Sequence, residues 1–186
     1  ISEGLLRLGR PEVVKEYVEY YAPYQFENGK VPCCVDDRGS DPVPENDSHG
    51  ELIFNIAEYY RYTGDKDFLK RMWPHVQGAF AYMEELRLSE RTEANRAVNA
   101  AFYGMMPASI SHEGYSAKPM HSYWDNFWAL RGYKDAVEVA EALGEAAAAK
   151  RMAASRDQFR DDLYASLRAA TQLHGIHYLP GAAWIG

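Results

Sequence analysis

Apolar residues recur at the spacing of an amphipathic helix along most of the chain. Val14, Tyr17, Val18 and Tyr21 occupy positions i, i+3, i+4 and i+7, which places their side chains on one face of a helix. Longer stretches of the same kind begin near residues 49, 66, 122 and 145. No stretch of comparable length alternates apolar and polar residues, so any strands should be short and lie in loops. The pattern predicts an all-α protein.

Three of these helical stretches end at a glycine, and a second helix is expected to begin one or two residues later. Gly9, Gly64 and Gly144 can each adopt the left-handed conformation that terminates a helix. Acidic residues follow each glycine, as is favourable at a helix N-terminus. Pro74 falls inside a predicted helix and is expected to start it or kink it. The predicted elements are three helical hairpins in a single domain, 1–186, at about 1–24, 49–88 and 122–172.

The connections between hairpins are much longer than the turns within them. Residues 25–47 and 89–121 form the long connections, and 174–186 begins another. Short turns at one end and long loops at the other place the long loops on one face, where long loops are usually functional. The N-termini of the first helices, with their free N–H groups, gather there as well. An α-solenoid is an alternative, but its repeats keep a fixed period, whereas the turn glycines here are unevenly spaced.

Carboxylates are concentrated in the first long loop. They are Asp36, Asp37, Asp41, Glu45 and Asp47. Asp47 or Ser48 can cap the start of the next helix, and Glu51 after Ser48 would complete a capping box. A single helix cap does not account for both Glu45 and Asp47, so we interpret them as candidates for hydrogen bonding to sugar hydroxyls.

The same loop offers two weak indications of a metal site. The spacing of Asp36, Asp37 and Asp41 is similar to acidic clusters that bind metal ions on helices, but Gly39 and Pro42 predict a loop here. The adjacent residues 33–34 are the two cysteines of the chain, and without a second pair they do not form a zinc site. We interpret them as reduced thiols, with a vicinal disulfide as the alternative. No metal and no cofactor are predicted.

The second long loop combines polar and aromatic residues. His112 and Glu113 lie in an aromatic-rich segment, and a helix is expected to begin with a second group of such residues. That group is Tyr123, Trp124, Asp125 and Asn126. A tryptophan beside an aspartate and an asparagine suits a sugar subsite, because the C–H faces of sugars are apolar and their rims polar. The structural alternative is that Ser122 or Asp125 caps the helix.

Composition narrows the classes of partner. The 186 residues are 47% hydrophobic and 13% aromatic, and 20 basic against 27 acidic residues give a net charge of -7. A basic stripe for nucleic acid is therefore not expected. No apolar run reaches the roughly 18 residues that span a membrane, and no signal-peptide pattern is present, so the sequence assigns no compartment. Both ends fall in apolar patterns, and we interpret them as cut ends.

Four short stretches resemble the six-hairpin glycosidases, the (α/α)6-toroid superfamily of trehalases, glucoamylases and α-L-rhamnosidases. The stretches are PENDSHG (44–50), EYYRYTGD (58–65) with FL (68–69), GMMP (104–107) and YWDNFW (123–128). The resemblance implies that the three hairpins form about half of such a toroid. Further signatures of trehalases and rhamnosidases are missing, so it identifies the superfamily better than any one activity.

The implied activity is glycoside hydrolysis with inversion, which needs a carboxylic acid and a carboxylate on opposite sides of the sugar. Glu113 is the first candidate for the acid and Glu45 the second, while the base would lie beyond Gly186. Asp47, His112, Tyr123, Trp124, Asp125 and Asn126 are the candidate substrate-binding residues. A carbohydrate-binding or scaffold module and a polysaccharide lyase remain alternatives. The expected partners are a carbohydrate and either the remaining half of the toroid or a second copy.

Overall fold

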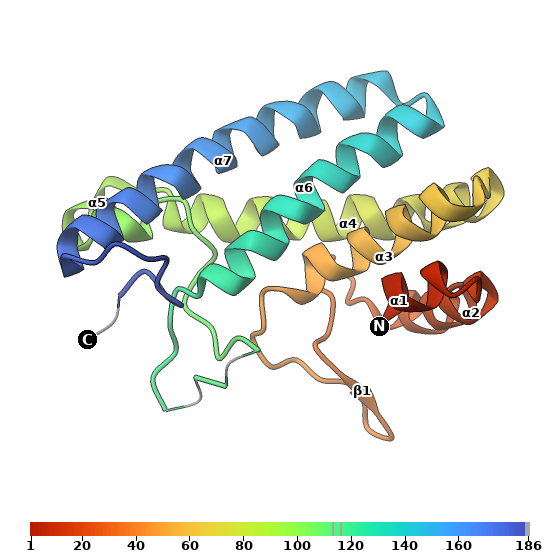
Figure 1. The fold of residues 1–186 in the computed structure, drawn as a ribbon, viewed down its shortest axis with the longest axis horizontal. Helices are drawn as coiled ribbons and strands as arrows, with labels where there is room; N and C mark the ends of the chain where they lie inside the picture. The colour runs from red at the N-terminus through yellow and green to blue at the C-terminus, as the bar shows by residue number, and fades with distance from the viewer. Residues whose placement is uncertain (113, 116, 185–186) are drawn as a thin grey trace.

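The computed structural model describes residues 1–112, 114–115 and 117–184, and this part of the chain is predominantly α-helical (Figure 1). The prediction of an all-α fold is confirmed. The helices are α1 (Ser2–Arg7), α2 (Pro11–Tyr21), α3 (Ser48–Thr63), α4 (Lys66–Glu90), α5 (Glu93–Val98), α6 (Tyr123–Leu143) and α7 (Ala146–His174), with 3-10 turns η1 (Ala22–Tyr24) and η2 (Ala100–Phe102).

Two of the helical hairpins turn at glycines in the left-handed conformation. Gly64, with φ of 66°, ends α3, and Gly144, with φ of 78°, ends α6. Asp65 then caps α4, because its Oδ1 accepts the backbone N–H of Phe68 at 2.9 Å. The turn positions predicted from the sequence are therefore where the chain reverses.

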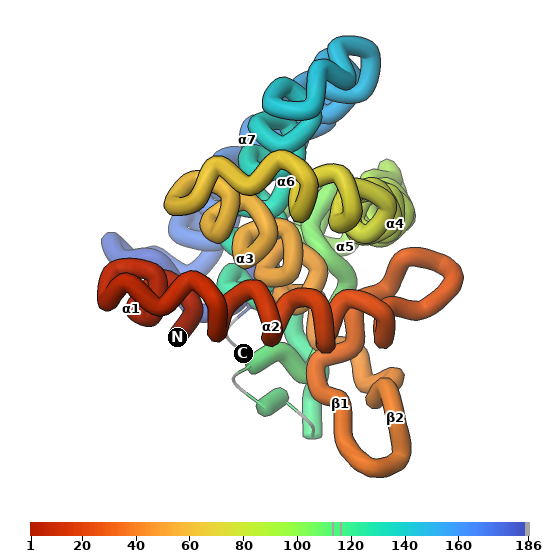
Figure 2. The backbone as a smooth tube through the Cα atoms, turned by 90° about the vertical axis from the view of Figure 1, so that its right-hand side faces the viewer, coloured from red at the N-terminus to blue at the C-terminus, as the bar shows by residue number. Residues whose placement is uncertain are grey.

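The centre of the molecule is the contact between α3 and α6, which is the most extensive between any two helices of the described residues. Gly50 and Gly132 make this approach possible. A Cβ on Gly50 would lie 2.0 Å from the carbonyl oxygen of Trp128, and one on Gly132 would lie 2.7 Å from the Cα of Gly50. Figure 2 shows α3 lying between α6 and the α1–α2 pair. The two backbones meet directly, so the start of α3 is held against α6.

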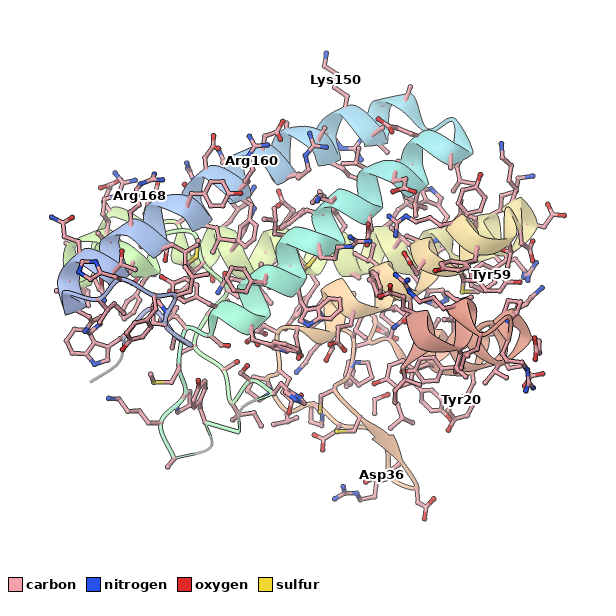
Figure 3. All side chains as sticks on the ribbon, viewed as in Figure 1. Tyr20, Asp36, Tyr59, Lys150, Arg160 and Arg168 are labelled. Atoms are coloured by element: carbon pink, nitrogen blue, oxygen red, sulfur yellow. The ribbon has the colours of Figure 1, made fainter. Side chains whose placement is uncertain are left out.

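Apolar side chains from all the long helices fill the core around this contact. Ile53, Phe68, Met83, Tyr133 and Phe159 are fully buried. Figure 3 shows that Lys150 and Arg168 point away from the bundle along α7, whose outer face is polar. None of the helices described combines the length and the apolar character needed to cross a membrane.

The long loops extend from one side of the helices (Figure 1). In the first loop, β1 (Val35–Asp36) pairs antiparallel with β2 (Gly39–Ser40), with Val35 opposite Ser40. These are the short loop strands that the sequence pattern allowed. Ile110, in the segment that precedes α6, is hydrogen-bonded to Pro44 of the first loop, and residues 181–183 pair with residues 121–123.

Three local expectations were wrong in whole or in part. Of the two roles expected for Pro74, starting the helix is wrong, because α4 begins at Lys66 and continues through Pro74. Asp47, one of the two predicted caps, is the N-cap of α3, but the capping box does not form, because the Ser48 hydroxyl contacts the Asp47 carboxylate at 3.4 Å. The connection expected over 89–121 contains α5, which Thr92 caps by accepting the N–H of Asn95.

Candidate functional site

The two long loops are joined to each other where α3 and α6 begin. The backbone N–H of Ile110 donates to the carbonyl of Pro44 at 3.1 Å. The side-chain amide of Asn46 donates to the carbonyl of Pro107 at 3.0 Å. Residues far apart in the sequence thus form one surface at the N-terminal ends of the two central helices.

Three carboxyl groups, which we call the carboxylate cluster, lie on this surface: Glu45, Asp47 and Glu51. Asp47 is 4% exposed, whereas Glu45 and Glu51 are partly exposed. Burial and then the charge of Asp47 raise the pKa of Glu45. Burial, followed by the charge of Asp47, raises the pKa of Glu51 to about 7. The cluster therefore holds a carboxyl group that exchanges its proton near neutral pH.

Glu51 borders a cavity of about 570 Å³ between α1, α2, α3 and α6. Its aromatic walls are Tyr17, Phe54 and Trp128, and Asn55 adds an amide. Glu51 also lines a smaller cavity, together with Tyr21, Cys33 and Ser48, among others. A carboxyl group between apolar walls loses hydration, which accounts for the raised pKa.

An aromatic row connects the carboxylate cluster to the larger cavity. The ring of His112 stacks on Trp124 with 5.3 Å between centroids, and Trp124 meets Trp128 edge-on at 6.0 Å. Trp128 in turn contacts Phe54 at 5.5 Å. The indole N–H of Trp124 donates to Asp47 Oδ2 at 2.7 Å. Trp124 remains 38% exposed, so it offers an apolar surface beside the carboxylate cluster.

Four of the predicted substrate-binding residues are buried: Asp47, described above, and Tyr123, Asp125 and Asn126. Tyr123 is 1% exposed, and its hydroxyl pairs with that of Ser166 at 2.8 Å. Asn126 is fully buried; its Oδ1 accepts the N–H of Met106, and its amide donates to the carbonyl of Ser122. These contacts attach the loop to the start of α6, and they leave neither side chain at the surface.

Asp125 is also fully buried. Its two oxygens accept the hydroxyls of Ser109 at 2.6 Å and Ser111 at 2.7 Å. Burial raises the pKa of Asp125 to about 6, although both hydroxyl hydrogen bonds act in the opposite direction. Asp125 therefore holds the second loop in place, and the structure gives it no access to a sugar.

The remaining predicted residues divide into two groups. Glu45, His112 and Trp124 are brought together at the surface described above, next to the buried Asp47 that accepts from Trp124, whereas Glu113 lies outside the described residues. Glu51 was missed as a candidate, because its spacing from Ser48 fitted a capping box. Its position four residues after Asp47, on the same face of the helix start, was the available signal.

Comparison with models of protein families and with curated protein sequences gives no match to this chain.

Proposed function

We propose that this chain forms the carbohydrate-binding face of a glycoside hydrolase built from (α/α) hairpins, with Glu51 as the general acid. The observation that carries the proposal is the Glu51 carboxyl, which has a pKa of about 7 and borders a cavity walled by Tyr17, Phe54 and Trp128. General acids are most effective when their pKa lies near the working pH. Aromatic walls suit the apolar faces of sugar rings.

Within the carboxylate cluster we assign the acid to Glu51 and the base to Glu45, which replaces the expectation of a base beyond Gly186. The protonated Glu51 would donate its proton to the glycosidic oxygen as the bond to the anomeric carbon breaks. Glu45, also partly exposed, would take a proton from the water that attacks this carbon. Asp47 is buried and bound to the indole of Trp124. Its charge would keep Glu51 protonated and would not act on the substrate directly.

The arrangement of the helices supports a toroid of the six-hairpin type. Hairpins α3–α4 and α6–α7 turn at single glycines, and both long loops extend from the opposite side (Figure 1). The inner helices of such a toroid begin on the face that carries the site, as α3 and α6 do here. On this proposal the three hairpins are about half of the ring.

The test is hydrolysis of a panel of neutral oligosaccharides by the wild-type protein and by Glu51→Gln. We expect Glu51→Gln to retain binding and to lower turnover by roughly 10²–10⁴-fold, the usual contribution of a general acid. Substrates with good leaving groups should recover part of this loss, since they need less protonation. Glu85→Gln, at an exposed position of α4, is the control and should behave as wild type. Full turnover by Glu51→Gln would refute the assignment.

Binding without turnover is the second candidate, and the stacked pair of His112 and Trp124 favours it. An exposed aromatic surface is sufficient to hold a sugar without any proton transfer. If the wild-type protein binds oligosaccharides and releases no product, the module is a binding module. Product mass separates the remaining alternative, because hydrolysis adds a water molecule, whereas a lyase leaves an unsaturated sugar.

A further inference from the structure

The base of the β1–β2 hairpin brings two thiols and a carboxylate together. The Sγ atoms of Cys33 and Cys34 lie 2.9 Å apart. One ligand atom from each cysteine and a carboxylate oxygen of Asp41 all lie within 4.8 Å of one another. These groups are separate from the carboxylate cluster, and the proposed function makes no use of them.

The hairpin itself fixes this juxtaposition. Asp36 pairs with Gly39 and Val35 with Ser40, so the next positions outward are Cys34 and Asp41. The backbone N–H of Asp41 donates to the carbonyl of Cys34 at 3.0 Å, which extends the pairing to these residues. Asp41 Oδ1 also accepts the N–H of Val43 at 2.9 Å, and this bond orients the carboxylate.

We propose that Cys33, Cys34 and Asp41 form a binding site for a thiophilic divalent cation of the zinc class. Thiolate sulfur and carboxylate oxygen are both ligands that zinc accepts. The two thiols would release their protons to solvent as the metal–sulfur bonds form. Three protein ligands would leave a fourth position for water or another group. Asp41 adds a third protein ligand, which the two adjacent cysteines lack by themselves.

The three ligand atoms lie close enough together to meet at one ion. A tetrahedral zinc ion holds its ligand atoms roughly 3.3–3.8 Å apart, given metal–ligand distances of about 2.0–2.3 Å. The two sulfur atoms, at 2.9 Å, would therefore have to move apart when the ion binds. Cys34 is exposed and Cys33 is half-buried, so an ion has access from solvent.

A metal here would fix the loop that carries part of the candidate site. Residues 42–44 follow Asp41 directly and lead to Glu45, the first member of the carboxylate cluster. Cys33 also lines the smaller cavity that Glu51 borders. A site at the hairpin base would therefore close this loop and stabilise the folded protein.

The test uses untagged protein reduced with a phosphine under anaerobic conditions and titrated with Co²⁺. We expect one ion to bind per chain, with a thiolate-to-cobalt absorption band that Zn²⁺ removes. Cys33→Ser and Cys34→Ser should each abolish the band, and Asp41→Asn should weaken Co²⁺ binding at least tenfold. Asp37→Asn, at the tip of the same hairpin, is the matched control and should titrate as wild type.

A second measurement does not depend on spectroscopy. Zn²⁺ at about 100 times its dissociation constant should raise the melting temperature by roughly 5–10 °C. The Cys33→Ser variant should show no such rise. The proposal is overturned if the reduced protein shows no saturable band, if Asp41→Asn binds like wild type, or if the cysteine variants retain full binding. Formation of a Cys33–Cys34 disulfide as the only reaction of these thiols would also overturn it.

Discussion

Glu51 is placed where its ionisation opposes folding. Its pKa rises to about 7, mainly through burial and then through the charges of Asp47 and Glu45. Between the ordinary carboxyl pKa and pH 7, the folded protein therefore binds more protons at this position than the unfolded chain does. The free energy of unfolding should consequently fall as the pH rises through this window.

The substitution Glu51→Gln should remove this dependence. Relative to wild type, the variant should gain stability between pH 5 and pH 8, by up to about 2 kcal/mol after discounting for the solvent that reaches the carboxyl. Urea unfolding at the two pH values measures the difference. Glu85→Gln should show no comparable gain, and equal pH dependence in Glu51→Gln and wild type would contradict the raised pKa.

Trp124 and Asp47 form a second pair whose energetics can be isolated. Trp124→Phe keeps an aromatic ring but removes the indole N–H that donates to the buried Asp47 carboxylate. We therefore expect the free energy of unfolding to fall by about 1–3 kcal/mol. The same substitution in an Asp47→Asn background should cost less, because no buried charge then loses its donor. Denaturant unfolding of the four proteins gives the coupling energy. Additive losses would show that the hydrogen bond contributes little.

The close approach of α3 and α6 depends on two glycines, in addition to side-chain contacts such as that between Phe54 and Trp128. A methyl group at position 132 would lie 2.7 Å from the backbone of Gly50, and backbone cannot rotate away as a flexible side chain can. Close contacts of this kind force the helices apart and disturb the packing on both sides.

We therefore expect Gly132→Ala to destabilise the protein by at least about 1–3 kcal/mol, as overpacking usually does. Gly4→Ala is the matched control, since Gly4 lies in α1 with no atom within 4 Å of the added Cβ. Alanine has the higher helix propensity, so the control should be neutral or slightly stabilising. Thermal unfolding measures both. A fully stable Gly132→Ala protein would mean that α3 and α6 do not approach as closely as described.

The sequence predicted the helical hairpins because their signals are local. A pattern with helical period that ends at Gly64 or Gly144 can be interpreted from residues close together in the sequence. The site was predicted less well, because its geometry depends on contacts between distant segments. Ser48 and Glu51 fit a capping box by spacing, yet the Ser48 hydroxyl turns to Asp47 instead. From the sequence, Asp125 is expected at the surface near a helix start. In the structure it is buried, and the hydroxyls of Ser109 and Ser111 donate to its carboxylate.

The molecule as a whole presents an apolar groove at the end opposite the α3–α4 turn. Val98 and Phe102 form one wall and Leu173 and Trp184 the other, around a cavity of about 810 Å³. Val98 is 78% exposed and Leu173 is 55% exposed. Apolar surface gathered in this way is typical of an association surface.

We expect the chain to self-associate through this groove unless further hairpins cover it. Introducing charge with Val98→Glu and Leu173→Glu together should shift sedimentation towards the monomer. Leu8→Glu, at an exposed apolar position outside the groove, should leave the distribution unchanged. Wild-type protein that sediments as a monomer at every concentration would contradict this expectation.

The hydrogen bonds that join the two long loops couple the opening of one loop to the opening of the other. The N–H of Ile110 is held by Pro44 of the other loop, and the N–H of Met106 is held by Asn126 at the start of α6. Neither loop can separate from the helices without breaking bonds to the other. The two loops should therefore open as one cooperative unit, and amides in both should exchange with deuterium at a common opening free energy. Segments separated by some sixty residues of sequence would then share a single local unfolding event.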